Sequence, residues 1–183
     1  MRNYEDYDDL THLFNNLKEN HPAILRESIN TLVTKPKMLE RRKAGQWEDD
    51  KYAEKIKDGW IHGWTEDDNW INYPIMYKGK LFPYAEKSLP TLCKYININS
   101  VYIAGLSVLK PNGVIREHFD DYDNSLTFHY NILCPTKGES IITIDGEKVI
   151  QKAGEALLFD AGKLHSVVNS SNEHRIILFI DYR

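Results

Sequence analysis

The chain has 183 residues, of which 42% are hydrophobic and 27% charged, and its formal net charge is -4 at pH 7. This composition is typical of a soluble globular protein, and no apolar run reaches the roughly 20 residues that a membrane-spanning helix requires. The negative charge disfavours nucleic acid as a partner, because phosphate binding needs a clustered basic face. We therefore expect a cytoplasmic protein that acts on a small molecule or a peptide, with neither a membrane nor a nucleic acid as partner.

Residues 1–44 are expected to form N-terminal helices. In the first, apolar residues recur three and four positions apart and so share one helix face: Leu10, Leu13, Phe14 and Leu17. A second helix is predicted to begin near Pro22, because proline suits a first helical turn. Its buried stripe is predicted to contain Leu25, Ile29, Leu32 and Val33. Both helices should pack against a larger body.

Residues 45–70 contain all four tryptophans among many acidic residues. Such a segment can be a surface strip whose tryptophans anchor it to the body. It can also be a loop that contacts a substrate, since long ordered loops are often functional. Both interpretations stay open, and the second predicts that substitution of Trp60 or Trp64 changes turnover.

Residues 71–183 are expected to form a β-roll core. β-Branched and aromatic runs such as VYIAGLSVL, SLTFHYNIL and HRIILFIDY alternate with turn residues, as in an all-β sandwich or barrel. Asp145 and Gly146 lie between two such runs and predict a tight hairpin, because a type I′ turn needs positive φ at both central positions. We predict a single domain over residues 1–183, mainly β with flanking α-helices, whose core is a double-stranded β-helix of the jelly-roll or cupin type.

Three polar residues of the predicted roll have the spacing of a metal site. His118 and Asp120 lie at positions i and i+2 after a turn, so their side chains point to the same side of an extended segment. His165 begins a later strand, and strands distant in sequence become neighbours in a β-roll. Two imidazoles and one carboxylate form the facial triad of non-haem Fe(II) oxygenases. This spacing alone is a weak signal, because Asp121 or Asp123 could replace Asp120 and all of these carboxylates could be solvated.

Arg175 stands at the head of the very apolar run IILFI, which predicts that its guanidinium enters the roll. A buried charge needs an oppositely charged partner. That partner is either a dicarboxylate co-substrate or an internal aspartate such as Asp160 or Asp181. His129 can be a half-buried structural histidine of its strand. The other histidines are interpreted as structural: His12, His21, His62 and His174.

Several of these residues lie in motifs that resemble the aspartyl/asparaginyl β-hydroxylase family of Fe(II)- and 2-oxoglutarate-dependent oxygenases, which includes bacterial hydroxylases of free proline. GLSVLKPNGVIREH is similar to the family's strand, turn and first iron-binding histidine, which implies His118 as an iron ligand. GEALLFDAGKLHSVVNSSNEHRIILFIDY is similar to the second signature. It implies His165 as an iron ligand and Arg175 as the residue that binds the far carboxylate of 2-oxoglutarate. Ser107 and His129 match positions that contact 2-oxoglutarate in the family.

The resemblance extends over residues 70–181 and has two departures from the family pattern. With Asp120, the chain is more similar to the branch that acts on free amino acids, which has a full iron-binding triad. The vertebrate aspartyl hydroxylase, in contrast, holds iron with two histidines and no carboxylate. Thr127 stands where the family has an arginine, so co-substrate binding should rest more on Arg175 and His129.

The resemblance implies an Fe(II)- and 2-oxoglutarate-dependent dioxygenase that uses O₂ to hydroxylate an unactivated C–H bond. Its expected substrate is an amino acid or an amino-acid residue of a peptide, of the aspartate, asparagine or proline type. The Trp-rich segment and the loop DDYDN are expected to recognise this substrate. Three alternatives stay open: a non-oxidative cupin-type metalloenzyme, a non-catalytic sensor module that binds the metal or 2-oxoglutarate, and a purely structural β-domain.

Overall fold

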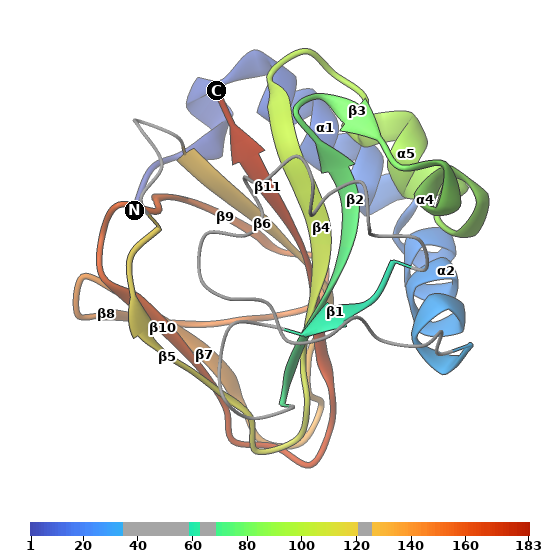
Figure 1. Ribbon diagram of the computed structural model, residues 1–183. Coiled ribbons are helices and arrows are strands. Elements are labelled where there is room, and N and C mark those ends of the chain that lie inside the picture. The colour runs from blue at the N-terminus through green and yellow to red at the C-terminus, as the bar shows by residue number, and fades with distance from the viewer. Residues whose placement is uncertain (35–58, 63–68, 121–125) are drawn as a thin grey trace.

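A computed structural model describes residues 1–34, 59–62, 69–120 and 126–183. Two β-sheets face each other, and helices cover the outer face of the larger sheet (Figure 1). The helices are α1 (Asp8–Glu19), α2 (His21–Val33), α4 (Pro83–Ser88) and α5 (Pro90–Ile96), and a short 3₁₀ turn, η1 (Tyr4–Asp6), precedes α1. None of the helices in these ranges is long and apolar enough to cross a membrane.

The larger sheet has the strand order β1-β2-β4-β11-β6-β9, with β3 paired to β2. Its strands are β1 (Ile61–His62), β2 (Trp70–Tyr77), β3 (Lys80–Leu81), β4 (Val101–Leu109), β6 (Leu126–Leu133), β9 (Ala156–Asp160) and β11 (Arg175–Tyr182). The smaller sheet has the order β5-β10-β7-β8. Its strands are β5 (Val114–His118), β7 (Ser140–Ile144), β8 (Glu147–Ile150) and β10 (His165–Asn169).

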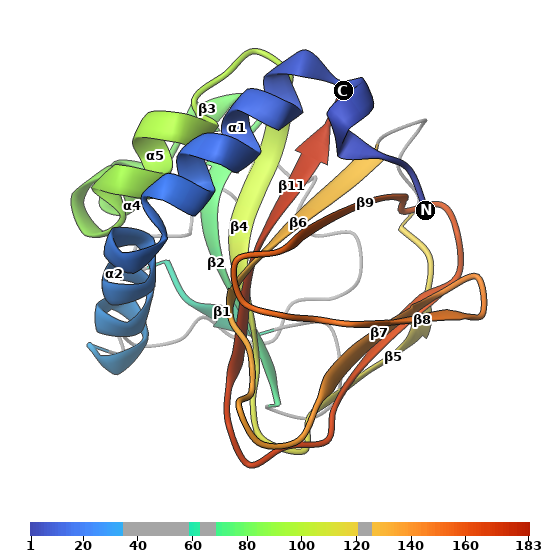
Figure 2. The ribbon, with the colours of Figure 1, turned by 180° about the vertical axis from the view of Figure 1, so that it is seen from behind.

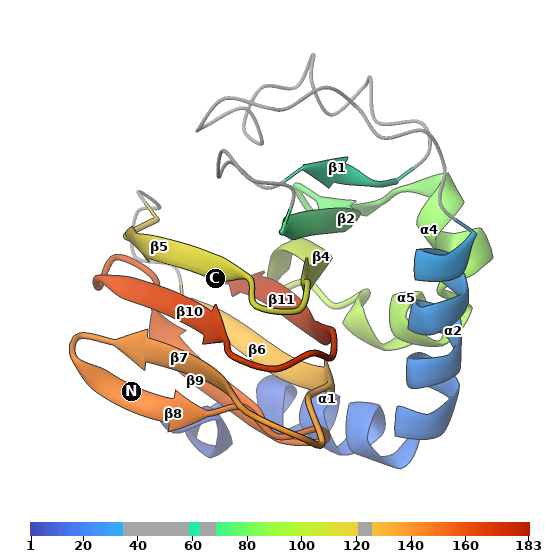
Figure 3. The ribbon, with the colours of Figure 1, turned by 90° about the horizontal axis from the view of Figure 1, so that it is seen from below.

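From β4 onward the chain passes repeatedly from one sheet to the other. β4, β6, β9 and β11 belong to the larger sheet, and the strands between them belong to the smaller one. This alternation produces a double-stranded β-helix and confirms the predicted jelly-roll fold, mainly β with flanking helices. Figure 3 shows the smaller sheet on one side of the larger sheet and the helices on the other.

The two faces of the larger sheet have different chemistry. Leu106, Val108 and Leu178 belong to the core that includes the buried leucines of α1, which crosses the sheet on this side (Figure 2). Successive side chains of a strand point to opposite faces. Ser107 therefore faces the interior of the roll, as does Arg175 on β11. The interior thus combines apolar residues with a few buried polar ones, and it is the place where a ligand can be held.

The buried stripe of α2 differs from the predicted one. Leu25 and Leu32 pack against the core as predicted. Ile29 is 37% exposed and Val33 is 74% exposed, and Ile24, Ser28 and Thr31 are buried instead. This orientation of the helix is accompanied by a polar contact with a part of the chain that is distant in sequence. Glu27 accepts hydrogen bonds from the backbone N–H and the hydroxyl of Thr91 at the start of α5 (3.1 and 2.6 Å). This polar contact accompanies the inward face around residues 24, 28 and 31, which apolar periodicity alone does not reveal.

The predicted β-core of residues 71–183 also contains two helices that the sequence interpretation missed. α4 and α5 begin at Pro83 and Pro90, in the first helical turn where proline is favoured. Buried residues of this insertion recur at helical spacing: Leu89, Leu92, Cys93 and Ile96. The signal was therefore present in the sequence, within a region that otherwise consists of strands.

The hairpin between β7 and β8 confirms its prediction. Ile144 pairs with Glu147, and Asp145 and Gly146 form the turn with φ of 52° and 84°. Both central residues have the positive φ that a type I′ turn requires.

Candidate metal centre

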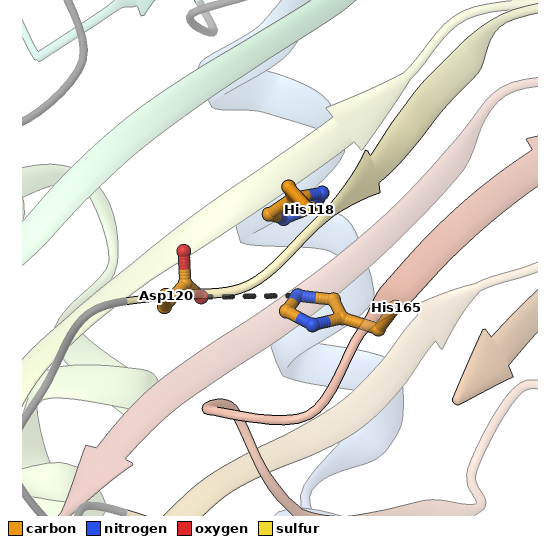
Figure 4. Close-up of side chains that lie close together, drawn as sticks. All are labelled: His118, Asp120 and His165. Carbon is orange, nitrogen blue, oxygen red and sulfur yellow. Dashed lines mark ion pairs between the residues drawn. The ribbon is translucent and has the colours of Figure 1, made fainter. Parts of the chain in front are cut away.

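His118, Asp120 and His165 meet at one end of the roll. His118 ends β5, His165 begins β10, and the pairing of these strands makes the two histidines direct neighbours in register. The backbone N–H of Asp120 donates to the carbonyl of Ala161 (2.9 Å), which holds the segment after β5 beside the loop before β10. One candidate ligand atom from each of the three residues lies within 4.8 Å of the other two. Figure 4 shows the three side chains close together.

The two histidine rings are oriented by the same kind of hydrogen bond, from Nδ1 to a backbone carbonyl. Nδ1 of His118 lies 2.7 Å from the carbonyl oxygen of Arg116, and Nδ1 of His165 lies 2.8 Å from that of Lys163. A carbonyl oxygen can only accept, so each Nδ1 carries a proton, and Nε2 is the nitrogen that carries the lone pair in the neutral ring. Metal-binding histidines commonly have such a second hydrogen bond, which fixes both the tautomer and the ring orientation.

Asp120 completes a set of two imidazoles and one carboxylate. Its Oδ2 lies 3.8 Å from Nε2 of His165, and its side chain is 36% exposed. The other acidic candidates, Asp121 and Asp123, lie outside the described residues. A two-histidine, one-carboxylate set with open positions suits a non-haem ferrous ion.

The surroundings of His118 favour its neutral, metal-binding form. Burial, and then the proximity of His165, lowers the pKa of His118. The two ring centroids lie 4.1 Å apart, so two protonated rings would repel each other. The neutral imidazole is the form that binds a metal.

Arg175 lies inside the roll as a buried cation with neutral neighbours. It is 1% exposed, and its Nε donates to Oε1 of Gln151 (3.1 Å). Its Nη1 donates to the hydroxyl of Ser107 (3.1 Å). Burial lowers the pKa of Arg175 to about 10, so the guanidinium stays charged at neutral pH.

The structure does not bring the proposed internal aspartates to Arg175. Oδ1 of Asp160 accepts from the backbone N–H of Gly162 (2.9 Å), and Asp181 lies 3.3 Å from the guanidinium of Arg183. Among the described residues no carboxylate pairs with Arg175. Its charge is therefore available to an anionic ligand.

Ser107 and His129 offer further polar atoms to the interior. The hydroxyl of Ser107 accepts from Arg175 and from Nε1 of Trp70 (2.9 Å), and both partners can only donate. The hydroxyl proton of Ser107 is thus left to donate to a ligand. Nδ1 of His129 is buried without a hydrogen-bond partner in the described part of the chain. Burial, and then the charge of Arg175, holds the pKa of His129 well below its usual range, so this imidazole is neutral.

Trp70 contributes to this site, although the sequence interpretation assigned it to the Trp-rich segment. It begins β2, donates to Ser107, and its ring lies 6.3 Å from that of His118 between centroids. It therefore connects the metal cluster with the serine and arginine. The apolar run INYPIMY that follows Trp70 would have indicated a strand rather than a loop.

Trp60 has a different place, in the core on the helix side. It is 2% exposed, and its Nε1 donates to the carbonyl of Thr31 in α2 (3.1 Å). Its ring packs edge-on against Tyr73 at 5.0 Å between centroids. These contacts favour the anchor interpretation for Trp60, whereas Trp64 lies outside the described residues.

These observations define a class of protein: a β-roll with a two-histidine, one-carboxylate cluster at one end and an uncompensated arginine in its interior. The chain matches the family model described as aspartyl/asparaginyl beta-hydroxylase over residues 18–183. It belongs to this family of hydroxylases, as its motifs predicted.

The relatives of the chain differ in their names and in their lengths. An uncharacterized protein of Acanthamoeba polyphaga mimivirus is 32% identical over 97% of this chain and 68% of its own length. The aspartate beta-hydroxylase domain-containing protein 2 of Xenopus tropicalis is 26% identical over 69% of this chain and 36% of its own length. The ornithine lipid ester-linked acyl 2-hydroxylase of Rhizobium tropici is 24% identical over 64% of this chain. The chain covers 43% of that enzyme. It therefore spans less than half the length of the Xenopus tropicalis and Rhizobium tropici relatives.

Among solved structures, a predicted oxalate decarboxylase of Thermotoga maritima aligns with 62% of this chain and 79% of its own. The TM-score is 0.42 and the sequence identity is 18%.

Proposed function

We propose that this chain is an Fe(II)- and 2-oxoglutarate-dependent dioxygenase that hydroxylates an unactivated C–H bond. In this proposal His118, Asp120 and His165 hold the iron, and Arg175 binds the distal carboxylate of 2-oxoglutarate. The observation that carries the proposal is the buried guanidinium that has no carboxylate partner among the described residues, in the same roll as the metal cluster. A dicarboxylate would neutralise the arginine at one end and chelate a metal at the other.

The remaining interior groups fit the same ligand. The hydroxyl proton of Ser107 can donate to a carboxylate oxygen beside Arg175. Nδ1 of His129 is buried and unpaired among the described residues, a state that costs about 1–3 kcal/mol unless a ligand or water satisfies it. Both groups therefore support a polar ligand in the interior of the roll.

Iron and 2-oxoglutarate, when bound, supply the activation of O₂ and the oxidation of the substrate. The residues of the chain would hold and orient the iron and its co-substrate. His118 at the end of β5, Asp120 just after it and His165 at the start of β10 would hold the iron. Three protein ligands would leave coordination positions for the co-substrate and O₂. Trp70, which is 8% exposed, bonds Ser107 and has its ring 6.3 Å from that of His118, where it would limit the access of water to a bound co-substrate.

For the substrate we propose an amino acid or an amino-acid residue of a peptide. Family membership and the aspartate β-hydroxylase domain relatives support this class. We propose a cytoplasmic protein with neither a nucleic acid nor a membrane as partner; its net negative charge disfavours the nucleic acid.

An anaerobic titration of the metal-free protein with Fe(II) and then 2-oxoglutarate tests the proposal. We expect a weak visible charge-transfer band at about 500 nm, the signature of a 2-oxo acid chelated to a ferrous facial triad. His165→Ala should abolish the band, and Arg175→Met should raise the 2-oxoglutarate concentration needed to produce it. His12→Ala, a histidine of α1 outside the cluster, is the matched control. A protein that binds iron but never develops the band would instead be a cupin-type metalloenzyme of another class or a non-catalytic module.

A further inference from the structure

Gln151 lies directly against Arg175 and has no role in the function proposed above. It follows β8, is 3% exposed, and its Oε1 lies 3.1 Å from Nε of Arg175. Nε can only donate, so the oxygen end of the amide must face the arginine. The same oxygen also accepts from the hydroxyl of Ser140 (2.9 Å).

The other atoms of Gln151 fix the side chain from further strands. Nε2 donates to Oδ1 of Asn131 on β6 (3.2 Å), and the backbone N–H donates to the carbonyl of Ser140 on β7 (2.8 Å). Asn131 and Ser140 are themselves buried, at 2% and 0% exposure. Partners from both sheets therefore hold the amide, and the amide in turn holds the guanidinium of Arg175.

The neutrality of Gln151 matters as much as its position. A glutamate has the same shape and would form a charge-assisted hydrogen bond with Nε, which is stronger than the bond from an amide. It would also cancel the charge that attracts an anion. The amide accepts the same hydrogen bond but leaves the charge of Arg175 in place.

We propose that Gln151 is a positioning residue, which fixes the guanidinium of Arg175 and keeps its charge available for an anionic ligand. This inference rests on the proposed function, because the anion would be the distal carboxylate of 2-oxoglutarate. Ser107 occupies Nη1 of the guanidinium, while Nη2 has no hydrogen-bond partner in the described ranges. Nη2 is therefore the nitrogen that remains for the ligand.

The test compares two acids on the Fe(II)-loaded protein by anaerobic calorimetry. 2-Oxoglutarate has a distal carboxylate, whereas 2-oxobutanoate offers the same 2-oxo acid chelate without it. We expect Gln151→Glu to raise the dissociation constant of 2-oxoglutarate by about tenfold or more and that of 2-oxobutanoate by less than about twofold. Gln151→Met removes the acceptor without adding a charge and should weaken 2-oxoglutarate binding less than the glutamate does.

The possible outcomes distinguish a failure of the role proposed for Gln151 from a failure of the proposed function. If Gln151→Glu leaves both dissociation constants unchanged, or raises both equally, Gln151 does not act on Arg175 and the inference is overturned. If the wild type binds 2-oxobutanoate as tightly as 2-oxoglutarate, or neither acid, the proposed function fails and the inference fails with it. If circular dichroism shows that the variants at 151 do not fold, Ser140→Ala removes the hydroxyl that holds Oε1. It should weaken 2-oxoglutarate binding alone, by about threefold, and equal effects on both acids overturn the inference.

Discussion

The three candidate metal ligands are held with different firmness. Each histidine has its Nδ1 fixed by the carbonyl two residues earlier in the chain. The carboxylate of Asp120 is more exposed, and its residue is held through the backbone bond to Ala161. The imidazoles are therefore preorganised, and Asp120 is the ligand whose contribution most needs a direct test.

Asp120→Asn should weaken metal binding by at least about tenfold, because an amide replaces a charged oxygen ligand while the shape is kept. Titration of the metal-free protein with Fe(II) or Mn(II) measures this. The control is Asp160→Asn, a nearby carboxylate whose bond to the backbone of Gly162 an asparagine oxygen can also accept. Equal affinity in wild type and Asp120→Asn would exclude Asp120 as a ligand and leave a two-histidine site.

The buried His129 should make the stability of the protein depend on pH. Its folded-state pKa lies well below the unfolded value of about 6.5. Between these two values the unfolded chain binds a proton that the native protein excludes, so the free energy of unfolding falls as the pH decreases below about 6.5. The loss of stability between about pH 7.5 and about pH 5.5 therefore includes a contribution from this group.

His129→Gln removes this proton and should lose less stability than the wild type over the same pH interval. Urea unfolding at the two pH values measures the difference for each protein. An identical loss in both would show that His129 titrates normally, and that its ring is not held neutral by burial.

At the scale of elements, Trp60 joins α2 to the larger sheet through its bond to Thr31 and its contact with Tyr73. Trp60→Ala should destabilise the protein by about 3–5 kcal/mol, as expected for removal of a buried aromatic side chain. Trp60→Phe keeps a ring in place, loses the hydrogen bond and should cost less. Denaturant unfolding measures both. If Trp60→Ala kept full stability and lost turnover, the substrate-contact interpretation of this tryptophan would be restored.

Much of the fold could be predicted because its signals are local. The β-branched runs gave the strands, and Asp145 with Gly146 gave the hairpin, since backbone preference alone determines that turn. The face of α2 could not be fully predicted from apolar spacing. It is accompanied by the contact between Glu27 and Thr91, two residues that are far apart in the sequence.

The candidate site likewise combines residues that could be predicted from local sequence patterns with one that could not. His118 and Asp120 could be proposed together because an i, i+2 pair on an extended segment shares one side. Their approach to His165 follows from strand pairing across the smaller sheet, which the motif resemblance anticipated. Gln151 could not be found, because a glutamine after a strand has no distinguishing pattern. Only the contact of its amide with Arg175 gives it a role.

At the scale of the whole molecule, the two sheets carry different parts of the proposed site. The metal ligands lie on or beside β5 and β10 of the smaller sheet, whereas Arg175 begins β11 of the larger sheet. A ligand that binds both the metal and the arginine would therefore connect the two sheets. Such a connection should appear as added stability, because ligand that binds only the folded state favours that state by mass action.

We expect Mn(II), a redox-stable substitute for Fe(II), to raise the melting temperature. 2-Oxoglutarate should raise it further only when the metal is present, because its 2-oxo acid end would bind through the metal. At about 100 times its dissociation constant the ligand should contribute about 2.7 kcal/mol. His165→Ala should abolish both increments, whereas Arg175→Met should keep the first and reduce the second. If 2-oxoglutarate stabilised the metal-free protein as much as the metal-loaded one, Arg175 would bind the anion without the metal, and the two sheets would not share one ligand.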